Sequence, residues 1–231
     1  MRSAVLFFFI VLAAFAYCQT PPVHAICDMP GTWSGTLSQI LMFDSVQGYE
    51  TNYGEIYIDD QKQQIRFDIL AGKTNLGGSP VSYSDSIWQD FENKIEYILD
   101  RNTNICISQP LNLPFSGQLP SNSQYGGALL VGSQPVHEYF FPQTLANTTY
   151  QVEVGLMSGT CLPFNIEIYK MGSQPRMVMT EAVFNAVPMI PPFVMEIPSQ
   201  CTSSSLFVGE VPEKFAKIRQ ALALHSLAFE Q

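Results

Sequence analysis

The sequence is poor in charged residues. Asp, Glu, Lys and Arg make up only 13% of the chain, whereas roughly 25% is usual for globular proteins. The apolar fraction is 46%, so the chain has more apolar side chain than its few charges would lead one to expect. That surplus can fill a core, line a cavity or form a subunit interface.

Basic residues are the scarcer charge. There are 11 Lys and Arg against 20 Asp and Glu, and the formal net charge is −9. An acidic chain lacks the basic surface that binds phosphate groups, so we expect no nucleic acid partner and no purely electrostatic binding to anionic membranes. The acidic balance is compatible with cation binding, and a plain solvated acidic surface explains it equally well.

Motifs for catalysis and for calcium binding are also missing. The chain has no Gly-x-Ser-x-Gly motif, no EF-hand loop, and no second histidine to make His137-Glu138 a zinc site. A Ser-His-Asp triad does not require closeness in sequence, but no nucleophile motif accompanies the three histidines, His24, His137 and His225. We therefore predict a protein that is not an enzyme, with no catalytic residue and no cofactor set by a motif.

Long apolar runs are absent except at the beginning. Met1-Arg2 is positively charged, and the apolar run from Ala4 to Ala16 is shorter than the ~20 residues of a spanning helix. This arrangement is typical of a secretory signal peptide, here with cleavage after Cys18, and an uncleaved membrane anchor is the alternative. We expect residues 1–18 to be removed and residues 19–231 to form a single domain that is secreted and does not span a membrane.

Cysteine usage fits an oxidising compartment. Of the five cysteines, the mature chain keeps Cys27, Cys106, Cys161 and Cys201, which predict two bridges with three connectivities open. No CxxC pair occurs, which argues against a zinc ribbon or a thioredoxin-like site. The sequon Asn147-Thr148-Thr149 predicts a glycosylated, exposed loop.

The mature chain predicts strands separated by turns. Gln64 to Ile69 alternates polar and apolar residues at period two, and with Tyr53 to Ile58 it predicts a hairpin around Asp59 to Lys62. The same reasoning predicts further strands at Trp33 to Phe43, Ile105 to Ser108, His137 to Phe141, Tyr150 to Met157, Pro163 to Met171 and Met177 to Phe184.

Other segments predict loops or leave two interpretations. Residues 86–99 place Ile87, Phe91, Ile95 and Ile98 near helical spacing, yet two strands hinged at Glu92-Asn93 are preferred because turn residues follow at 100–102. Loops rich in Gly, Pro, Ser and Asn are expected at 72–80 and 111–127, and an extended irregular segment at 188–198.

The C-terminal region predicts one helix. Pro212 suits a helix start, and an apolar stripe extends to Phe229. We expect this helix to pack on the sheet, with membrane binding as the alternative.

Five methionines lie between Met171 and Met195. Methionine adapts to varied ligands, but it also fills ordinary cores.

Five blocks, in order along the chain, resemble the ependymin-related family. Cys27-Asp28-Met29-Pro30 with Trp33 resembles the family's N-terminus. The later blocks are Gly54 to Asp59 followed by Gln64 to Phe67, then Tyr97 to Asp100 ahead of Cys106 and Leu111, then Gly159 to Pro163, and finally Pro198 to Cys201. The resemblance spans nearly all of the mature chain.

The resemblance implies two stacked, curved antiparallel sheets around a deep apolar pocket, similar to bacterial lipoprotein-carrier folds. It implies a secreted, often dimeric glycoprotein associated with calcium, with cell-matrix adhesion and with anionic lipid in acidic compartments such as the lysosomal lumen. It further implies the bridges Cys27–Cys161 and Cys106–Cys201. The chain lacks a third cysteine pair found in vertebrate members, and no motif assigns calcium to particular residues.

Together these expectations describe a mainly β glycoprotein that binds anionic lipid or acyl chains by burying apolar area, at roughly 25 cal/mol per Å². A structural or adhesive matrix homodimer without a lipid ligand is the first alternative, and a secreted hydrolase is the second. The residues expected to line the pocket, from period-two alternation, are Trp33, Phe43, Tyr57, Phe67, Trp88, Phe91, Tyr97, Phe140, Tyr150 and Met179. Protonation of carboxylates at acidic pH would weaken repulsion from anionic headgroups.

Overall fold

The computed structural model describes residues 27–42, 48–75, 81–115, 117–145, 147–202 and Leu224. The predicted signal peptide, Phe43, His24 and His225 lie outside the described residues. So does the predicted helix from Pro212 to Phe229, except for Leu224. This residue is helical, is 5% exposed and belongs to the main hydrophobic core.

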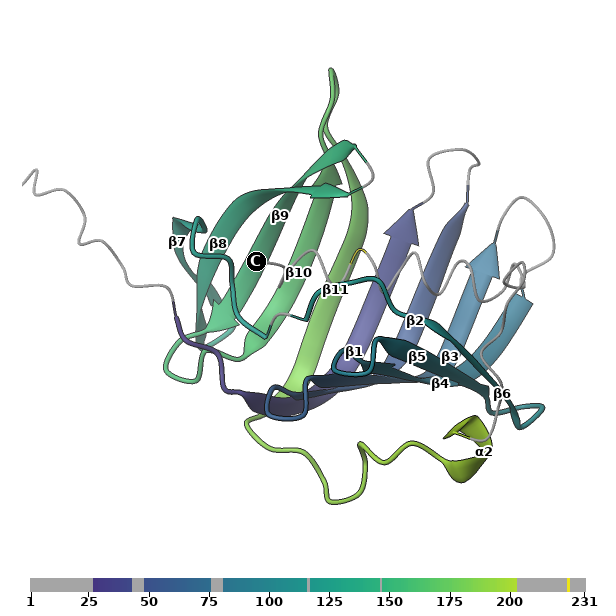
Figure 1. Ribbon diagram of the computed structural model, residues 1–231. Helices are drawn as coiled ribbons and strands as arrows, with labels where there is room; N and C mark the ends of the chain where they lie inside the picture. Colours follow the sequence, from purple (N-terminus) through teal and green to yellow (C-terminus); the bar gives the residue numbers. More distant parts are fainter. Residues whose placement is uncertain are drawn as a thin grey trace, which may run out of the picture.

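Antiparallel β-strands make up most of the described chain (Figure 1). The strands are β1 (Thr32–Met42), β2 (Tyr49–Asp59), β3 (Gln64–Asn75), β4 (Val81–Asp90), β5 (Ile95–Asp100), β6 (Ile105–Pro110), β7 (Gln124–Val131), β8 (Gln134–Leu145), β9 (Thr148–Met157), β10 (Pro163–Lys170) and β11 (Arg176–Val187). A four-residue helix, α2 (Ser199–Thr202), follows them.

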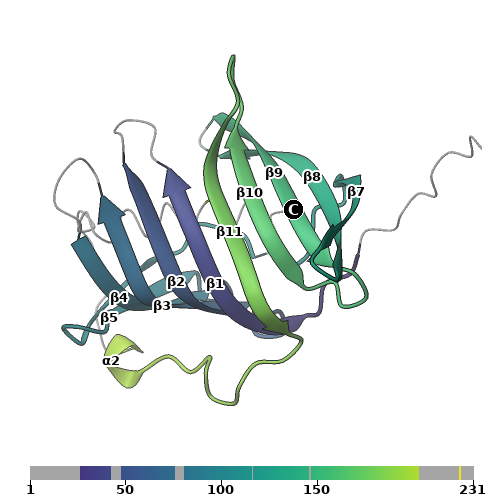
Figure 2. The same ribbon diagram turned by 180° about the vertical axis from the view of Figure 1, so that it is seen from behind.

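All strands belong to one 11-stranded sheet in the order β6-β5-β4-β3-β2-β1-β11-β10-β9-β8-β7. The chain proceeds from the central strand β1 to the edge strand β6. Residues 111–123 then cross to the opposite edge at β7, and the later strands return until β11 pairs with β1. Figure 1 shows this crossing segment passing over the concave side of a strongly curved sheet, and Figure 2 shows the sheet from behind.

Bulges interrupt the regular pairing at several places, and bulges bend a sheet and increase its twist. Register shifts occur between Tyr53 and Gly54, between Ile69 and Gly72 and between Tyr125 and Gly127, among others. The first requires glycine, because a Cβ atom on Gly54 would lie 1.9 Å from the carbonyl oxygen of Asp68. The curvature of the sheet thus has local causes in the sequence.

The predicted fold class is confirmed at the level of a mainly β, antiparallel protein. The hydrogen bonding joins all of the strands into one continuous sheet, so the division into two stacked sheets and the pocket remain predictions. Residues 86–99 are two strands, β4 and β5, as expected. The irregular segment 188–198 is also confirmed, since it contains no strand or helix.

Two loop predictions are wrong in part. β3 extends through Gly72 to Asn75. Gly72 fits in the strand because it has no side chain, which leaves room for the ring of Tyr83. A Cβ atom added to Gly72 would lie 2.2 Å from Cε2 of that ring. β7 begins at Gln124 and includes Gly126 and Gly127, where the bulge accommodates both glycines. In both places a strand continues through residues whose composition predicted a loop.

Candidate functional site

The concave face of the sheet carries the hydrophobic core. Strand register aligns Ile56 of β2 with Phe67 of β3, then Ile87 of β4 and Ile98 of β5. On the other side of β1, Met179 of β11 aligns with Ile168 of β10, then with Val152 of β9 and Phe141 of β8. All eight side chains are at most 2% exposed. They form one apolar floor across most of the sheet's width.

Trp33 adds an unsatisfied hydrogen-bond donor to this floor. It aligns with Ile58, is 0% exposed and belongs to the same core. Its indole Nε1–H has no hydrogen-bond partner in the described part of the chain. Burying a donor without an acceptor costs about 1–3 kcal/mol, so a ligand oxygen within reach of Nε1 would be stabilised there.

A row of buried polar side chains crosses the floor between the four residues aligned with Ile56 and the four aligned with Met179. Gln39 donates from Nε2 to Oε2 of Glu181 at 3.0 Å, and its Oε1 accepts from Nδ2 of Asn52 at 3.0 Å. Asn52 Nδ2 also donates to Oε1 of Glu50 at 3.2 Å. The hydroxyl of Tyr83 lies 2.5 Å from both Glu50 Oε1 and Asn52 Oδ1. This polar row (Glu181, Gln39, Asn52, Glu50 and Tyr83) spans strands β11, β1, β2 and β4.

The polar row sits in an environment that disfavours added charge. Each of its side chains is at most 5% exposed. Burial raises the pKa of the Tyr83 hydroxyl well above its usual range, and the neighbouring Glu50 and Asp85 raise it further. Tyr83 is therefore a neutral hydroxyl throughout the physiological range, able to donate one hydrogen bond and to accept others.

A second buried polar group lies toward the other end of the same strands. Glu96 accepts from Gln89 Nε2 at 2.9 Å and from Gln109 Nε2 at 2.5 Å. Gln89 aligns with Ile65, which aligns with Ile58 beside Trp33. In the half of the sheet formed by β1 to β6, the apolar floor is therefore bounded at both ends by buried amides and carboxyl groups.

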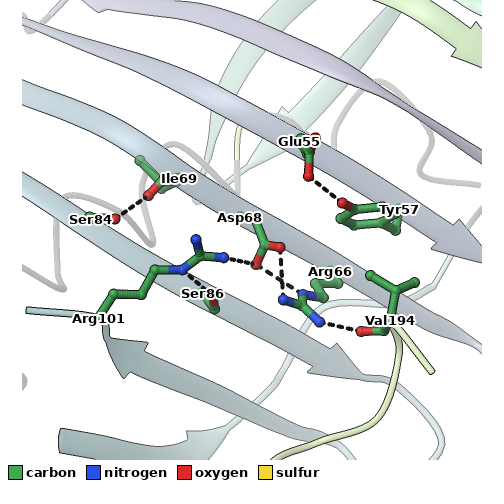
Figure 3. A network of polar contacts seen from close by, with 9 residues as sticks. All are labelled: Glu55, Tyr57, Arg66, Asp68, Ile69, Ser84, Ser86, Arg101 and Val194. Carbon is green, nitrogen blue, oxygen red and sulfur yellow. Dashed lines mark hydrogen bonds and ion pairs between the residues drawn. The ribbon is translucent and has the colours of Figure 1, made fainter. Parts of the chain in front are cut away.

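The convex face carries a different network, which Figure 3 shows from close by. Asp68 binds Arg66 through two contacts, Nε to Oδ1 at 2.9 Å and Nη2 to Oδ2 at 2.7 Å. Arg101 Nη2 lies 2.8 Å from Asp68 Oδ1, and its Nε donates to Ser86 Oγ at 2.7 Å. The Arg66 guanidinium also lies 4.6 Å from the centre of the Trp88 ring.

This convex network fastens the segment that follows β11. Residues 188–198, here called the strap, lie outside the curve of the sheet, below it in both Figure 1 and Figure 2. Arg66 Nη1 donates to the carbonyl oxygen of Val194, and Ser34 Oγ donates to that of Met189 at 2.8 Å. The Cys106–Cys201 bridge joins α2 to β6 just beyond the strap.

The structure distributes the predicted pocket residues over both faces. Trp33, Phe67, Tyr150 and Met179 occupy concave positions, and Phe91 joins the main core from the turn after β4. By register, four others occupy the opposite, convex face: Tyr57, Trp88, Tyr97 and Phe140. Period-two alternation separates the two faces of a strand, but it does not say which face is the interior.

The cysteines and the sequon lie where their chemistry is feasible. Cys27 is bonded to Cys161 and Cys106 to Cys201, which are the pairs that the resemblance implies. Asn147 is exposed in the turn between β8 and β9.

Among the described residues, no helix is long and apolar enough to cross a bilayer. The same residues contain no group of three or more His, Cys, Asp or Glu side chains that could hold a metal ion.

The polar row was missed by reasoning from the sequence. The sequence of β1 does contain a sign of this row. Gln39 lies between Leu37 and Leu41 in the alternating pattern, so a polar residue interrupts an otherwise apolar face. Asn52 and Glu181 align with Gln39 on either side. Recognising the row requires the strand register, which only the structure provides.

Comparison with known proteins adds little. No family model matches the chain, and no curated protein matches it. Among solved structures, the chain is similar to an uncharacterized conserved protein from Thermus thermophilus, with 10% sequence identity and a TM-score of 0.47. The match covers 74% of this chain and 87% of that one.

Proposed function

We propose that the protein is a secreted, ependymin-related glycoprotein that binds an acyl chain of a lipid against the concave face of its sheet. The observation that carries this proposal is the apolar floor from β5 across to β8, together with the buried polar row that crosses it. The two disulfides are compatible with an oxidising compartment. The stacked sheets and the enclosed pocket implied by the resemblance belong to the proposal.

The energetics favour an acyl chain as the ligand. Each methylene removed from water contributes about 0.8 kcal/mol, so eight methylenes held on the floor would contribute roughly 6 kcal/mol before the cost of ordering the chain. The indole of Trp33 offers a hydrogen bond to an ester or carboxyl oxygen. The neutral hydroxyl of Tyr83 and the amides of Gln39 and Asn52 suit the polar end of such a ligand.

A matched pair of substitutions tests this proposal. Val154→Phe adds volume at a concave position that is 1% exposed, whereas Val81→Phe makes the same change at a position that is 56% exposed. We expect V154F to weaken binding of a fluorescent fatty acid at least 10-fold and V81F to leave it unchanged. Since overpacking a core costs about 1–3 kcal/mol, thermal melts establish that both variants are folded. Equal binding by V154F and the wild type would contradict a concave ligand site.

Binding to anionic liposomes tests the expected pH dependence. Carboxyl groups with ordinary pKa values near 4 become protonated as the pH falls, which reduces the negative charge of the chain. Pull-down from about pH 7.5 to about pH 4.5 should therefore show binding that increases toward acidic pH, with neutral liposomes as the control. Binding that does not change with pH would count against the electrostatic part of the proposal.

A matrix dimer without a lipid ligand is the second candidate, and one observation favours it. The convex side of the central strands exposes apolar side chains, with Ile40 at 41%, Tyr53 at 51% and Phe184 at 47%. Exposed apolar patches of this kind mark contact surfaces. Native mass spectrometry separates the candidates, because a carrier retains lipid, whereas a structural dimer has twice the chain mass and no ligand.

Calcium binding and cell-matrix adhesion rest on the resemblance alone. Titration calorimetry with calcium chloride tests the first, with heat of binding as the expected result. The absence of heat at millimolar calcium would rule out calcium as a ligand of this protein.

A further inference from the structure

Three side chains outside the polar row make a connected set at the β7 edge of the sheet. His137 of β8 lies between them, with Nε2 at 3.1 Å from Ser158 Oγ and Nδ1 at 3.2 Å from the hydroxyl oxygen of Tyr125. Tyr125 lies on β7, and Ser158 directly follows β9. All three residues are intermediate between buried and exposed, which is compatible with access by a solute.

The backbone holds Ser158 firmly in place. Its N–H donates to the carbonyl oxygen of Pro135 at 2.9 Å, which joins the turn after β9 to the start of β8. Cys161 donates from its N–H to the carbonyl oxygen of Met157 at 2.9 Å and is bonded to Cys27, so the four-residue turn is closed at both ends. Gly159 takes a φ of +85°, a conformation that glycine adopts without strain.

We propose that Ser158 is a nucleophile toward carboxylic esters, with His137 as its general base and Tyr125 as a positioning residue. A nucleophile within hydrogen-bond reach of a base, which a third group orients, is the arrangement that activates serine in acyl transfer. The required tautomer is neutral imidazole with its proton on Nδ1, donating to the oxygen of Tyr125. The lone pair of Nε2 then accepts the proton of Ser158.

The reaction consists of two balanced steps. In the first, Ser158 Oγ bonds to the ester carbonyl carbon and gives its proton to His137 Nε2, and the alcohol then leaves with that proton. In the second, water attacks the acyl-serine and gives a proton to His137, which returns it to Oγ as the carboxylic acid departs. The amide of Gly159, immediately after the nucleophile, holds the position from which acyl-transfer enzymes take one oxyanion donor.

This activity goes beyond the proposed lipid binding and does not depend on it. A secreted hydrolase was among the alternatives from the sequence, but no motif assigned Ser158 or His137, which are separated by 20 residues. Only the pairing of β8 with β9, which aligns His137 with Leu156, brings the imidazole next to the turn.

The test is covalent labelling of the purified full-length secreted protein with an alkyl fluorophosphonate, followed by peptide mapping. The expected adduct is on Ser158, because its oxygen displaces fluoride as His137 takes the proton. His137→Asn should slow labelling about 100-fold, the scale of general-base catalysis. Ser158→Ala should abolish the adduct, and Ser133→Ala, at an exposed serine, should label like the wild type.

Wild-type protein that gains no adduct, or gains it on another residue, would overturn the proposal, as would His137→Asn labelled at the wild-type rate. The role of Tyr125 has its own readout. Tyr125→Phe should shift the pH profile of labelling at Ser158, because the tautomer and basicity of His137 depend on its partner. A Tyr125→Phe profile that coincides with that of the wild type would remove Tyr125 from the mechanism.

Discussion

The carboxylate of Asp68 joins two arginines on the convex face. Replacing it tests how much this network contributes to the free energy of unfolding. Asp68 is 5% exposed and contacts both Arg66 and Arg101. The Asp68→Asn substitution keeps the shape of the side chain but removes its charge, which leaves two arginines close together without a counter-ion. Arg66 also holds the strap at Val194 (Figure 3), so the effect extends beyond the sheet.

The magnitude follows from burial. Removing one partner of a buried ion pair costs about 3–5 kcal/mol. The side chains of Arg66 and Arg101 keep 15% and 31% exposure, so water compensates in part, and we expect a loss near the lower end, about 3 kcal/mol. For a domain of this size, each kcal/mol lowers Tm by roughly 2–4 °C, which gives a decrease of about 6–12 °C.

The assay is thermal unfolding followed by circular dichroism, combined with limited proteolysis of the strap. The control is Lys62→Gln, which breaks the ion pair between Lys62 and Asp59, whose atoms lie 3.6 Å apart and whose lysine is 61% exposed. Exposed pairs contribute at most about 1 kcal/mol, so this variant should melt close to the wild type. If Asp68→Asn melts within about 2 °C of Lys62→Gln and the strap resists protease equally, the network does not stabilise the fold as argued.

Three further predictions concern charge, cross-linking and glycosylation. Partial burial, together with Glu167 and Glu138, raises the pKa of Glu153. Because a raised carboxyl pKa means that the folded protein gains stability as the pH falls, Glu153→Gln should raise Tm at pH 7 but not at pH 4. A rise in Tm at pH 4 and not at pH 7 would contradict the shift. Replacing Cys106 and Cys201 by serine opens a loop with a sequence separation of 95 and should cost roughly 3–5 kcal/mol in denaturant unfolding; a loss below about 1 kcal/mol would show that the bridge adds little constraint. Asn147→Gln should reduce the mass of the secreted protein by one glycan, and an unchanged mass would mean that the sequon is unused.

The strands were largely predictable from the sequence, because antiparallel strands leave a local signal. Gln64 to Ile69 alternates and is the first half of β3, and the turn residues at 92–93 lie between β4 and β5. The helical spacing of Ile87, Phe91, Ile95 and Ile98 was coincidental. Ile87 and Ile98 are in contact because they are paired across two strands. The spacing of apolar residues along the sequence does not distinguish such a pair of strands from a helix.

The candidate site was less predictable, because it depends on contacts between residues far apart in the sequence. Trp88 and Tyr57 have the aromatic character of pocket residues, but they lie on the convex face around Arg66. Gln39 and Glu181 are separated by 142 positions and meet only through the pairing of β1 with β11. Composition identifies which residues suit an apolar pocket, whereas the register decides which of them share a face.

Lipid extraction from the natively secreted protein, followed by mass spectrometry of the extract and of the intact complex, tests the central claim most directly. We expect a lipid retained in stoichiometric amount, with the intact mass exceeding that of the glycosylated chain by the mass of that lipid. A secreted protein whose intact mass equals that of the chain and its glycan, with no lipid in the extract, would contradict the claim.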